Sequence, residues 1–398
     1  MREGWANRII GDCFTGIKNG ANIQQKKGAA GIPITRIETL SGSVFNRDRL
    51  GYADITALGK YSSFVLNDGD ILMSHINSLA YIGRAVQYHK DGEETIIHGM
   101  NLLRLIPIRN IILPSFAEYY FKTDAFKWDI QGIANVSIHQ ASFNTKALKA
   151  LSIPVPSIQE QQRIVDILDR EFAKIDALKA NAEKSLQAAK DLFLQMLAHT
   201  FANPSWSWKR IGDVFDTGAG GTPLKTYQEY YENGDIPWLR SGEVCKKYIT
   251  ETEMFITQLG MDNSSAKMFP ENTVVVAMYG ATAGQVGILH LATTTNQAVC
   301  GIFPKEDYVP EFIYYSLLNS KKGLVAQATG NAQPNISQIK IKNTLVPVIS
   351  RKEQEEVVSN LDDLNAKCQF LQDNYQKTLA LCDDLKQSLL RKAFNGEL

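Results

Sequence analysis

Two long polar stretches of the chain carry apolar residues at spacings of three and four positions, which is the period of an α-helix. The apolar positions of the first stretch are Leu168, Ile175, Leu178, Ala182, Leu186, Ala189, Leu192 and Met196. Those of the second are Leu361, Leu364, Cys368, Leu371, Tyr375, Leu379, Cys382, Leu385 and Leu389. A stripe this narrow is typical of a coiled-coil seam. We therefore predict long helices in residues 154–201 and 347–398, each being the simplest partner for the other.

The two helical stretches are copies of one another, displaced by 193 positions. At that displacement Pro154 aligns with Pro347, Ser157 with Ser350, Glu160 with Glu353, Gln161 with Gln354 and Phe201 with Phe394. Each copy begins with a capping box, in which the serine hydroxyl accepts from the amide three residues on and the glutamate reaches back. Two unrelated core helices would have no reason to share length, cap and phase, so the pattern favours an internal duplication.

The duplication extends into the sequences between the helices. WANRIIGDCF at 5–14 matches WSWKRIGDVF at 206–215, and GIPITR at 31–36 matches DIPWLR at 235–240. The displacement is 204 at the second of these matches, falls to 196 near Pro114 and Pro310, and stays at 193 along the helices. Loop lengths therefore differ between two related globular domains. We predict recognition domains at 1–153 and 202–346, each followed by its helix at 154–201 and 347–398.

Each globular half shows the alternation of a mixed domain. The sequence predicts strands at 69–74, 81–88, 273–278 and 285–291, helices at 115–127 and 310–321, and closing strands at IPVP and LVPV before each long helix. Polar loops rich in Gly, Asn, Ser and Lys fall at 15–31, 41–51, 217–235 and 260–268. The expected fold class is α+β, with two mixed α/β domains joined by two long helices that form an antiparallel coiled coil with a pseudo-two-fold internal repeat.

The charge balance argues against a free-standing, non-specific nucleic-acid binder, whose affinity would depend on neutralising many phosphates. Lys plus Arg and Asp plus Glu number 42 each, and residues 1–153, with 17 basic and 13 acidic side chains, carry the only positive segment charge, +4. A sequence reader that takes phosphate contacts from a partner remains open. The five cysteines contain no CxxC pair, and there is no signal peptide or long apolar run. We expect a cytoplasmic protein with reduced thiols and no membrane association.

Catalytic motifs are missing from the sequence. It has no GxxxxGK[ST], GxSxG or HExxH, its six histidines lack metal-ligand spacing, and it has no Asn/Asp-Pro-Pro-aromatic tetrad of a base methyltransferase. TGAGGTP at 217–223 and YGATAGQVG at 279–287 are glycine-rich, but a turn or a close backbone approach explains both. The sequence therefore indicates a non-catalytic binding protein, with no metal and no cofactor of its own.

Several of these segments together resemble the specificity subunit of Type I restriction–modification systems. They are IPVPSIQEQQRIV at 153–165, VPVISRKEQEEVV at 346–358, SLLRKAFNGEL at 388–398, and TGAGGTP, IPWLR and TTNQAV (294–299) in the second domain. The first domain departs more, with IKNGAN where the second has TGAGGTP and HGMN where the second has TNQA. The resemblance covers essentially the whole chain.

The resemblance implies two domains that each read one part of a double-stranded DNA target, with the helix pair setting the gap, so that the target is bipartite and asymmetric. It also implies docking of methyltransferase subunits, two being expected, and of restriction (translocase) subunits. Those partners would supply the chemistry of S-adenosylmethionine, ATP and Mg. The chain itself would be the non-catalytic recognition subunit.

Candidate base-reading residues lie in the polar loops, because Arg, Lys, Asn and Gln pair with base edges and Ser or Thr serve bases or phosphates. In the first domain they are Lys18, Asn22, Gln24, Lys26, Lys27, Ser74, His75, Asn77 and Arg84. In the second they are Thr217, Thr222, Lys225, Tyr279, Thr282, Gln285, Asn296 and Gln297. For each residue the alternative is a solvated loop position or a local turn contact. Arg36 and Arg240 recur in the paired IPxxR motifs, and an internal ion pair is an equally good explanation for them.

Two further functions fit the same sequence. One is the specificity subunit of a related system whose partner fuses methylation and cleavage in one chain. The other is a coiled-coil scaffold with two protein-binding modules and no role in DNA binding.

Overall fold

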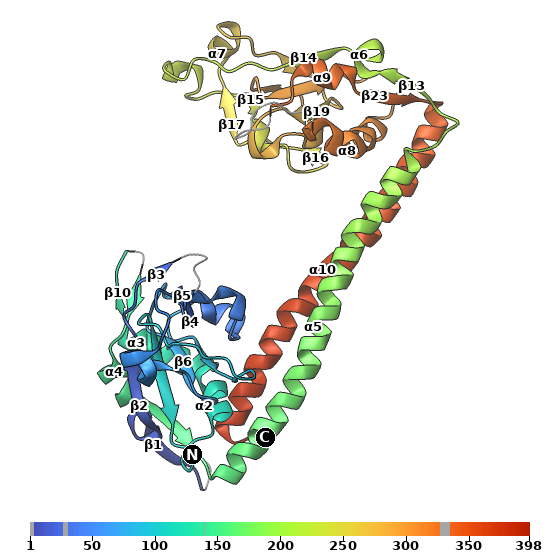
Figure 1. The fold of residues 1–398 in the computed structure, drawn as a ribbon. Coiled ribbons are helices and arrows are strands. Elements are labelled where there is room, and N and C mark those ends of the chain that lie inside the picture. The colour runs from blue at the N-terminus through green and yellow to red at the C-terminus, as the bar shows by residue number, and fades with distance from the viewer. Residues whose placement is uncertain (1–3, 27–30, 139, 327–334) are drawn as a thin grey trace. The chain divides into compact units, whose positions relative to one another are not determined.

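The computed structural model describes residues 4–26, 31–138, 140–326 and 335–398. The chain divides into two units, of which the first comprises Met1–Glu183 with Lys377–Leu398 and the second Lys184–Gln376. Each unit holds one globular domain and a part of both long helices, α5 (Ile158–Thr200) and α10 (Arg351–Asn395) (Figure 1). The expected α+β fold with an internal repeat is confirmed. The exact domain boundaries stay a prediction.

A four-stranded antiparallel sheet in the order β2–β9–β6–β8 lies in the first unit. Its strands are β2 (Phe14–Asn19), β9 (Leu102–Pro107), β6 (Ile71–Ser74) and β8 (Ala85–Gln87). Smaller sheets join β3 (Gln25–Lys26), β5 (Gly51–Ala53) and β4 (Ile32–Ile34), then β10 (Asn135–Val136), β11 (Ala141–Ser142) and β7 (Ile76–Asn77), and finally β1 (Ala6–Ile9) and β12 (Ser152–Val155). The helices are α1 (Ile10–Cys13), α2 (Pro114–Phe121), α3 (Asp124–Ile133) and α4 (Thr145–Ala150), with 3₁₀ segments Ile37–Ser43, Arg47–Arg49 and Gly59–Phe64.

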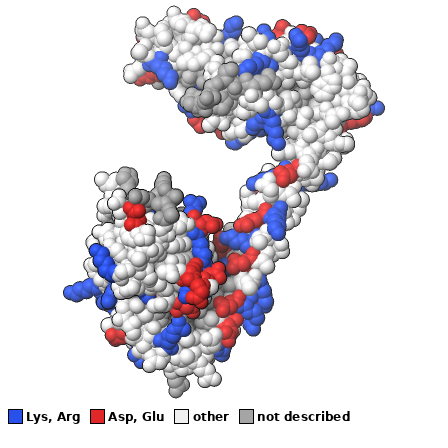
Figure 2. All heavy atoms as spheres, in the orientation of Figure 1, with Lys and Arg blue, Asp and Glu red and all other residues white. Residues whose placement is uncertain are grey.

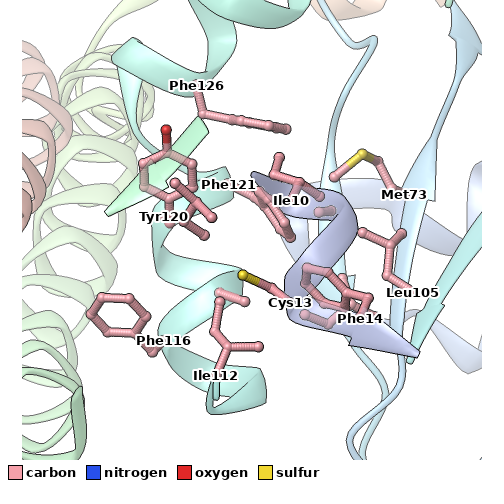
Figure 3. Packing of buried hydrophobic residues seen from close by; sticks show 14 of the residues in the cluster. Ile10, Cys13, Phe14, Met73, Leu105, Ile112, Phe116, Tyr120, Phe121 and Phe126 are labelled. Atoms are coloured by element: carbon pink, nitrogen blue, oxygen red, sulfur yellow. The ribbon is translucent and has the colours of Figure 1, made fainter. Parts of the chain in front are cut away.

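Aromatic side chains from α2 and α3 form much of the first unit's core (Figure 3). The ring centroid of Phe121 lies 4.6 Å from that of Phe126 and 6.2 Å from that of Phe14. The single helix predicted for 115–127 is wrong, because the chain divides there into α2 and α3. Thr123 caps the second helix, its hydroxyl accepting from the Phe126 amide at 3.1 Å.

The second unit repeats this plan with one more strand in the main sheet, whose order is β14–β22–β19–β20–β16. Its strands are β14 (Thr217–Ala219), β22 (Val299–Ile302), β19 (Val274–Ala277), β20 (Val286–Leu289) and β16 (Tyr248–Ile249). The other strands are β15 (Ile236–Leu239), β17 (Met254–Ile256), β18 (Met268–Phe269), β21 (Thr293–Thr295), β13 (Ser207–Arg210) and β23 (Leu345–Val348). The helices are α6 (Ile211–Val214), α7 (Gln258–Asp262), α8 (Pro310–Ala326) and α9 (Gln338–Asn343), with 3₁₀ segments Gln228–Tyr230, Ser241–Glu243 and Gly280–Thr282.

The far end of each long helix completes the core of one unit. In the first unit the ring of Phe394, near the end of α10, lies 5.0 Å from Phe116 and 5.3 Å from Tyr120. In the second unit Phe201, just after α5, lies 5.6 Å from Phe312. The closing strands predicted at IPVP and LVPV are confirmed, β12 pairing with β1 and β23 with β13. Each domain is thus closed by segments distant in sequence.

A buried glutamine fixes the start of each long helix to its domain. The Gln161 carboxamide accepts from the Leu113 amide at 2.8 Å and donates to the Ile111 carbonyl at 2.9 Å. Gln354 makes the matching bonds to the Val309 amide at 2.9 Å and the Asp307 carbonyl at 3.0 Å. Both glutamines are fully buried. Because buried amides must keep their hydrogen bonds, these contacts set where each helix leaves its domain.

The helix seam is narrower than the sequence predicts. The buried seam positions are spaced by seven residues in α5, at Leu168, Ile175, Ala182 and Ala189, and by seven and then fourteen residues in α10, at Leu361, Cys368 and Cys382. Leu178, Leu192, Met196, Leu371 and Leu385 were expected in the seam but are 38–51% exposed. In this helix pair one apolar position per heptad is covered by the partner helix, and the other apolar position lies at the edge of the seam. In the first unit, Lys179 contacts Asp383 at 2.6 Å and Asp176 contacts Lys386, which sets an antiparallel register.

Candidate nucleic-acid interface

Three sequence motifs of the second domain meet at one place in the second unit. β15 of the IPWLR motif runs parallel to β21 of the TTNQAV motif. The glycine-rich segment 217–223 lies against both, because the Gly221 amide donates to the Thr295 carbonyl at 2.8 Å and Trp238 Nε1 donates to the Gly221 carbonyl at 3.0 Å. The motifs therefore build a single surface element, which we call the motif junction.

Glycine is required at this junction by close backbone approach. A Cβ at Gly220 would lie 2.1 Å from the Thr295 carbonyl oxygen, and one at Gly221 would lie 2.3 Å from the Ala266 amide nitrogen. No phosphate-binding role is needed to explain the TGAGG sequence. The hydrogen-bonded junction places the loops on either side of it.

The first unit builds the same junction from different residues. The Ala21 amide donates to the His98 carbonyl at 2.7 Å, and the Gly99 amide donates to the Thr35 hydroxyl at 2.9 Å. A Cβ at Gly20 would lie 2.2 Å from the His98 carbonyl oxygen. IKNGAN, PITR and HGMN thus occupy the places of TGAGGTP, PWLR and TNQA. The departure of the first domain from the motif pattern is a change of side chains on a shared backbone arrangement.

The paired arginines of the IPxxR motifs serve the fold. Arg240 forms an ion pair with Glu243 at 3.1 Å and a second with Glu253. Arg36 Nε donates to the Gln25 carboxamide at 2.6 Å. The internal ion pair that we considered for these positions is present at Arg240, and Arg36 uses a neutral acceptor instead.

The candidate readers of the second domain fall into two groups. Lys225, Tyr279 and Gln297 are exposed, and the Gln297 carboxamide oxygen also accepts from the Thr222 hydroxyl. The others make contacts within the unit: Thr222 with Gln297, Thr217 with Gln338, Gln285 with Lys321, and Asn296 with the Ala298 amide, while Thr282 is half-buried. The contact between Thr222 and Gln297 joins two motif loops beside the junction. A role in base contact for these residues stays a prediction.

The candidates of the first domain are more scattered. Lys18, Asn22 and Gln24 are exposed, Asn77 and Arg84 are half-buried, Lys26 ends β3, and Lys27 lies outside the described residues. Ser74 is buried and its hydroxyl donates to the Tyr81 carbonyl at 3.0 Å. His75 is also buried, and its Nδ1 has no hydrogen-bond partner. The structure therefore places Ser74 and His75 beneath the surface rather than on it.

Two side chains next to Lys225 escaped sequence reasoning. Leu224 is 62% exposed and Tyr227 is 48% exposed on the same loop. The sequence did contain a signal for them, namely an apolar and an aromatic residue within an otherwise polar loop. Apolar side chains contact thymine methyl groups and aromatic rings stack on bases, so this loop offers more than hydrogen bonds.

The histidine at the first junction makes that unit sensitive to acid. Burial lowers the pKa of His98 to about 4, and the neutral ring lies 2.8 Å from the Leu102 carbonyl through Nε2. Burial also lowers the pKa of His75.

We expect the first unit to lose stability as the pH falls from about 6.5 to about 4, by at most about 3 kcal/mol from His98. Stability falls as the pH falls because, between about pH 6.5 and 4, His98 binds a proton in the unfolded chain and not in the folded one. Urea unfolding at several pH values measures the slope of the unfolding free energy against pH. The His98→Gln variant keeps a donor for Leu102 and should flatten it, whereas an unchanged slope in that variant would contradict the assignment.

The described residues contain no group of three or more His, Cys, Asp or Glu side chains placed to hold a metal ion. In the same part of the chain, no helix has the length and apolarity needed to cross a membrane. On the face drawn in Figure 2, basic and acidic side chains are interspersed, in line with the balanced composition.

Comparison with known proteins identifies both halves of the chain. Residues 2–188 and 203–379 each match the Type I restriction modification DNA specificity domain. A putative type I restriction enzyme MjaX specificity subunit from Methanocaldococcus jannaschii is 28% identical over 91% of this chain and 88% of its own length. The EcoR124I/EcoR124II specificity subunit of Escherichia coli is 26% identical over 54% of this chain and 55% of its own length.

Solved structures share the fold. A chain from a study of complex assembly and conformational transition of the type I R-M system superposes with a TM-score of 0.81, at 17% identity over 100% of this chain and 99% of that chain. The HsdS subunit of Thermoanaerobacter tengcongensis gives a TM-score of 0.61 at 18% identity, over 100% of this chain and 98% of that chain. With two matching domains, a repeated motif junction and paired helices, the chain belongs to the family of Type I restriction–modification DNA specificity subunits.

Proposed function

We propose that each unit reads one half of a bipartite, asymmetric DNA target. The observation that carries this proposal is the motif junction, which has the same backbone arrangement in both units and different side chains around it. Lys225 and Gln297 flank the junction of the second unit, and Asn22 and Gln24 follow that of the first. A shared platform with unlike readers is what two different half-sites require.

Gln297 is the sharpest test of base reading in the second unit, because a carboxamide pairs with adenine through two hydrogen bonds. We expect Gln297→Ala to weaken binding of the assembled complex by about 1–3 kcal/mol and to relax only the second half-site. Competition binding with DNA substituted at each position measures both effects. Gln258→Ala, at an exposed glutamine of α7, is the matched control and should change neither. A uniform loss at all positions would make Gln297 a phosphate contact or a structural residue.

We also propose that the helix pair holds two methyltransferase subunits, one in each unit, and that restriction subunits join that assembly. The positions of the exposed leucines support two subunits, one for each unit. Leu178 and Leu385 belong to the first unit, and their counterparts at a displacement of 193, Leu371 and Leu192, belong to the second. A seam left open on one side is completed by further helices, as in a bundle. S-adenosylmethionine, ATP and Mg would be bound by those partners.

Replacing these leucines by a charged residue tests the docking surfaces. We expect Leu178→Glu to reduce the bound methyltransferase subunits from two to one, Leu371→Glu to do the same, and the double variant to bind none, each site losing about tenfold or more in affinity. Native mass spectrometry of the full-length chain with the purified subunit counts them. Leu259→Glu, at an exposed leucine of α7, is the control. Two subunits still bound to the double variant would refute the surface.

A further inference from the structure

The turn that follows the glycine-rich segment presents apolar side chains to solvent beside the motif junction of the second unit. The Tyr227 amide donates to the Leu224 carbonyl at 3.1 Å, which closes a β-turn with Lys225 and Thr226 at its tip. Leu224 lies three residues beyond Gly221, whose amide belongs to the junction. Single exposed leucines are common on protein surfaces, so exposure alone indicates no contact. The position of Leu224 beside the junction is the more specific observation.

Aromatic residues hold this turn at both of its ends. At the first end, the Tyr231 hydroxyl donates to the Pro223 carbonyl, and the Tyr231 ring lies 5.8 Å from that of Trp238, the buried tryptophan of the junction. At the second end, the Tyr227 ring lies 5.1 Å from that of the buried Tyr230. The turn therefore has fixed ends, while the apolar side chain at its start stays uncovered.

A free cation stands between the apolar residues of the turn in the sequence. Lys225 is exposed, and within the described residues no carboxylate lies within 4.0 Å of its ammonium. Against an apolar protein surface this charge would be buried without a partner, which is costly. Against DNA it would face phosphates or acceptor atoms of bases, and the apolar side chain would face base edges. The composition of the turn therefore fits DNA better than a protein partner.

The first unit has a polar residue at the corresponding place. Ala21 is the counterpart of Gly221, since each amide donates to a carbonyl of the facing loop at the junction. Three residues further on, the first unit has the exposed Gln24 where the second has Leu224. A carboxamide pairs with base edges through hydrogen bonds, whereas an aliphatic side chain has no donor or acceptor. At this place the two units would therefore read bases by different chemistry.

We propose that Leu224 reads a thymine of the second half-site through the 5-methyl group of the base. That methyl is the apolar group that base pairs present in the major groove, so it is what a leucine beside base edges can recognise. The inference rests on the proposed reading of DNA by the second unit. It adds a specificity-determining residue and names the base that this residue selects.

Deoxyuridine tests the contact because it differs from thymidine only by the 5-methyl group. Each thymine of the target duplex is replaced in turn by uracil, and binding of the assembled complex is measured in competition with the unmodified target. For the wild type we expect one position of the second half-site at which loss of the methyl weakens binding about fourfold, the effect of one buried methyl-sized group. Leu224→Ala should bind the unmodified target more weakly and show no further loss with uracil at that position.

Two further variants separate the contact from other effects. Leu224→Met keeps an apolar side chain and should keep the dependence on the methyl group. Leu345→Ala, at a leucine of β23 that is 49% exposed, is the matched control and should respond to uracil as the wild type does. Thermal unfolding checks that each variant is folded, and native mass spectrometry counts the methyltransferase subunits that it binds.

The outcomes distinguish this inference from the proposed function. If the wild-type complex discriminates bases of the second half-site, but no uracil substitution weakens it or Leu224→Ala keeps the full loss, the thymine contact is wrong and reading by the second unit stands. If the wild-type complex discriminates no base of the second half-site, the proposed function fails and the contact fails with it. A loss of methyltransferase subunits in Leu224→Ala, with the response to uracil retained, would assign the turn to a protein partner and also overturn the contact.

Discussion

Replacing Gly220 by alanine is expected to abolish reading of the second half-site while the first is still recognised. The added Cβ would lie 2.1 Å from both the carbonyl oxygen and the hydroxyl of Thr295, and neither the strand nor the loop can move without breaking the motif junction. Overpacking of this kind costs about 3 kcal/mol, the upper end of its usual range. Binding to DNA that carries only one of the two half-sites separates the effects.

Gly242 provides the matched control for this change. A Cβ there would have no atom within 4 Å, so Gly242→Ala should bind both half-sites like the wild type. A Gly220→Ala variant that kept its affinity for the second half-site would show that the junction tolerates displacement and does not position the reading loops.

Removing Asp70 is expected to unfold the first domain. Its carboxylate lies 2.6 Å from the Arg104 guanidinium, with only 3% and 8% of the two side chains exposed, and it also accepts from the Asn67 amide at 2.7 Å. Asp70→Ala leaves an unpaired buried cation on β9, which costs about 3–5 kcal/mol. Since Arg104 is paired in the sheet with Lys18 of β2, we expect loss of the first half-site as well. Urea unfolding of the full-length chain measures the free energy.

Two further variants show whether the effect comes from the stranded charge. Glu93→Ala removes the fully exposed partner of Lys90, a pair separated by 4.0 Å, and should change the stability by less than about 1 kcal/mol. The double change Asp70→Leu with Arg104→Met removes both charges and should recover most of the loss. If the double variant were as unstable as Asp70→Ala, burial of the charge would not be the cause.

The parts of the fold that depend on local sequence could be predicted. The capping serines accept from Glu160 and Glu353 as expected, each at 3.3 Å, because capping is decided within one turn of helix. The closing strands at IPVP and LVPV are also confirmed. The alignment of Gln161 with Gln354 was visible in the sequence, but their bonds to loops about 50 residues away were not, because tertiary partners leave no local pattern.

The remaining differences between the sequence-based predictions and the structure also arise from tertiary contacts. Ile175 and Leu178 are equally apolar, yet only the first is covered by the partner helix, so periodicity alone does not distinguish the seam from its edge. Ser74 was predicted to be a DNA-reading residue on a polar loop, but its hydroxyl donates to the Tyr81 carbonyl instead. The motif junction unites residues that are far apart in sequence, and its glycines explain why the motifs recur although the reading side chains beside them differ.

Independent reading by the two domains is the central claim, and exchange of one domain tests it most directly. Residues 1–153 would be replaced by the same region of a relative with a different target, and the methylated motif of the complete complex would be determined by sequencing. The repeat offset varies only within the globular halves, so the exchanged domain should fit the unchanged helices. We expect one half of the motif to change, with the other half and the gap retained. A change in both halves, or in neither, would contradict this account.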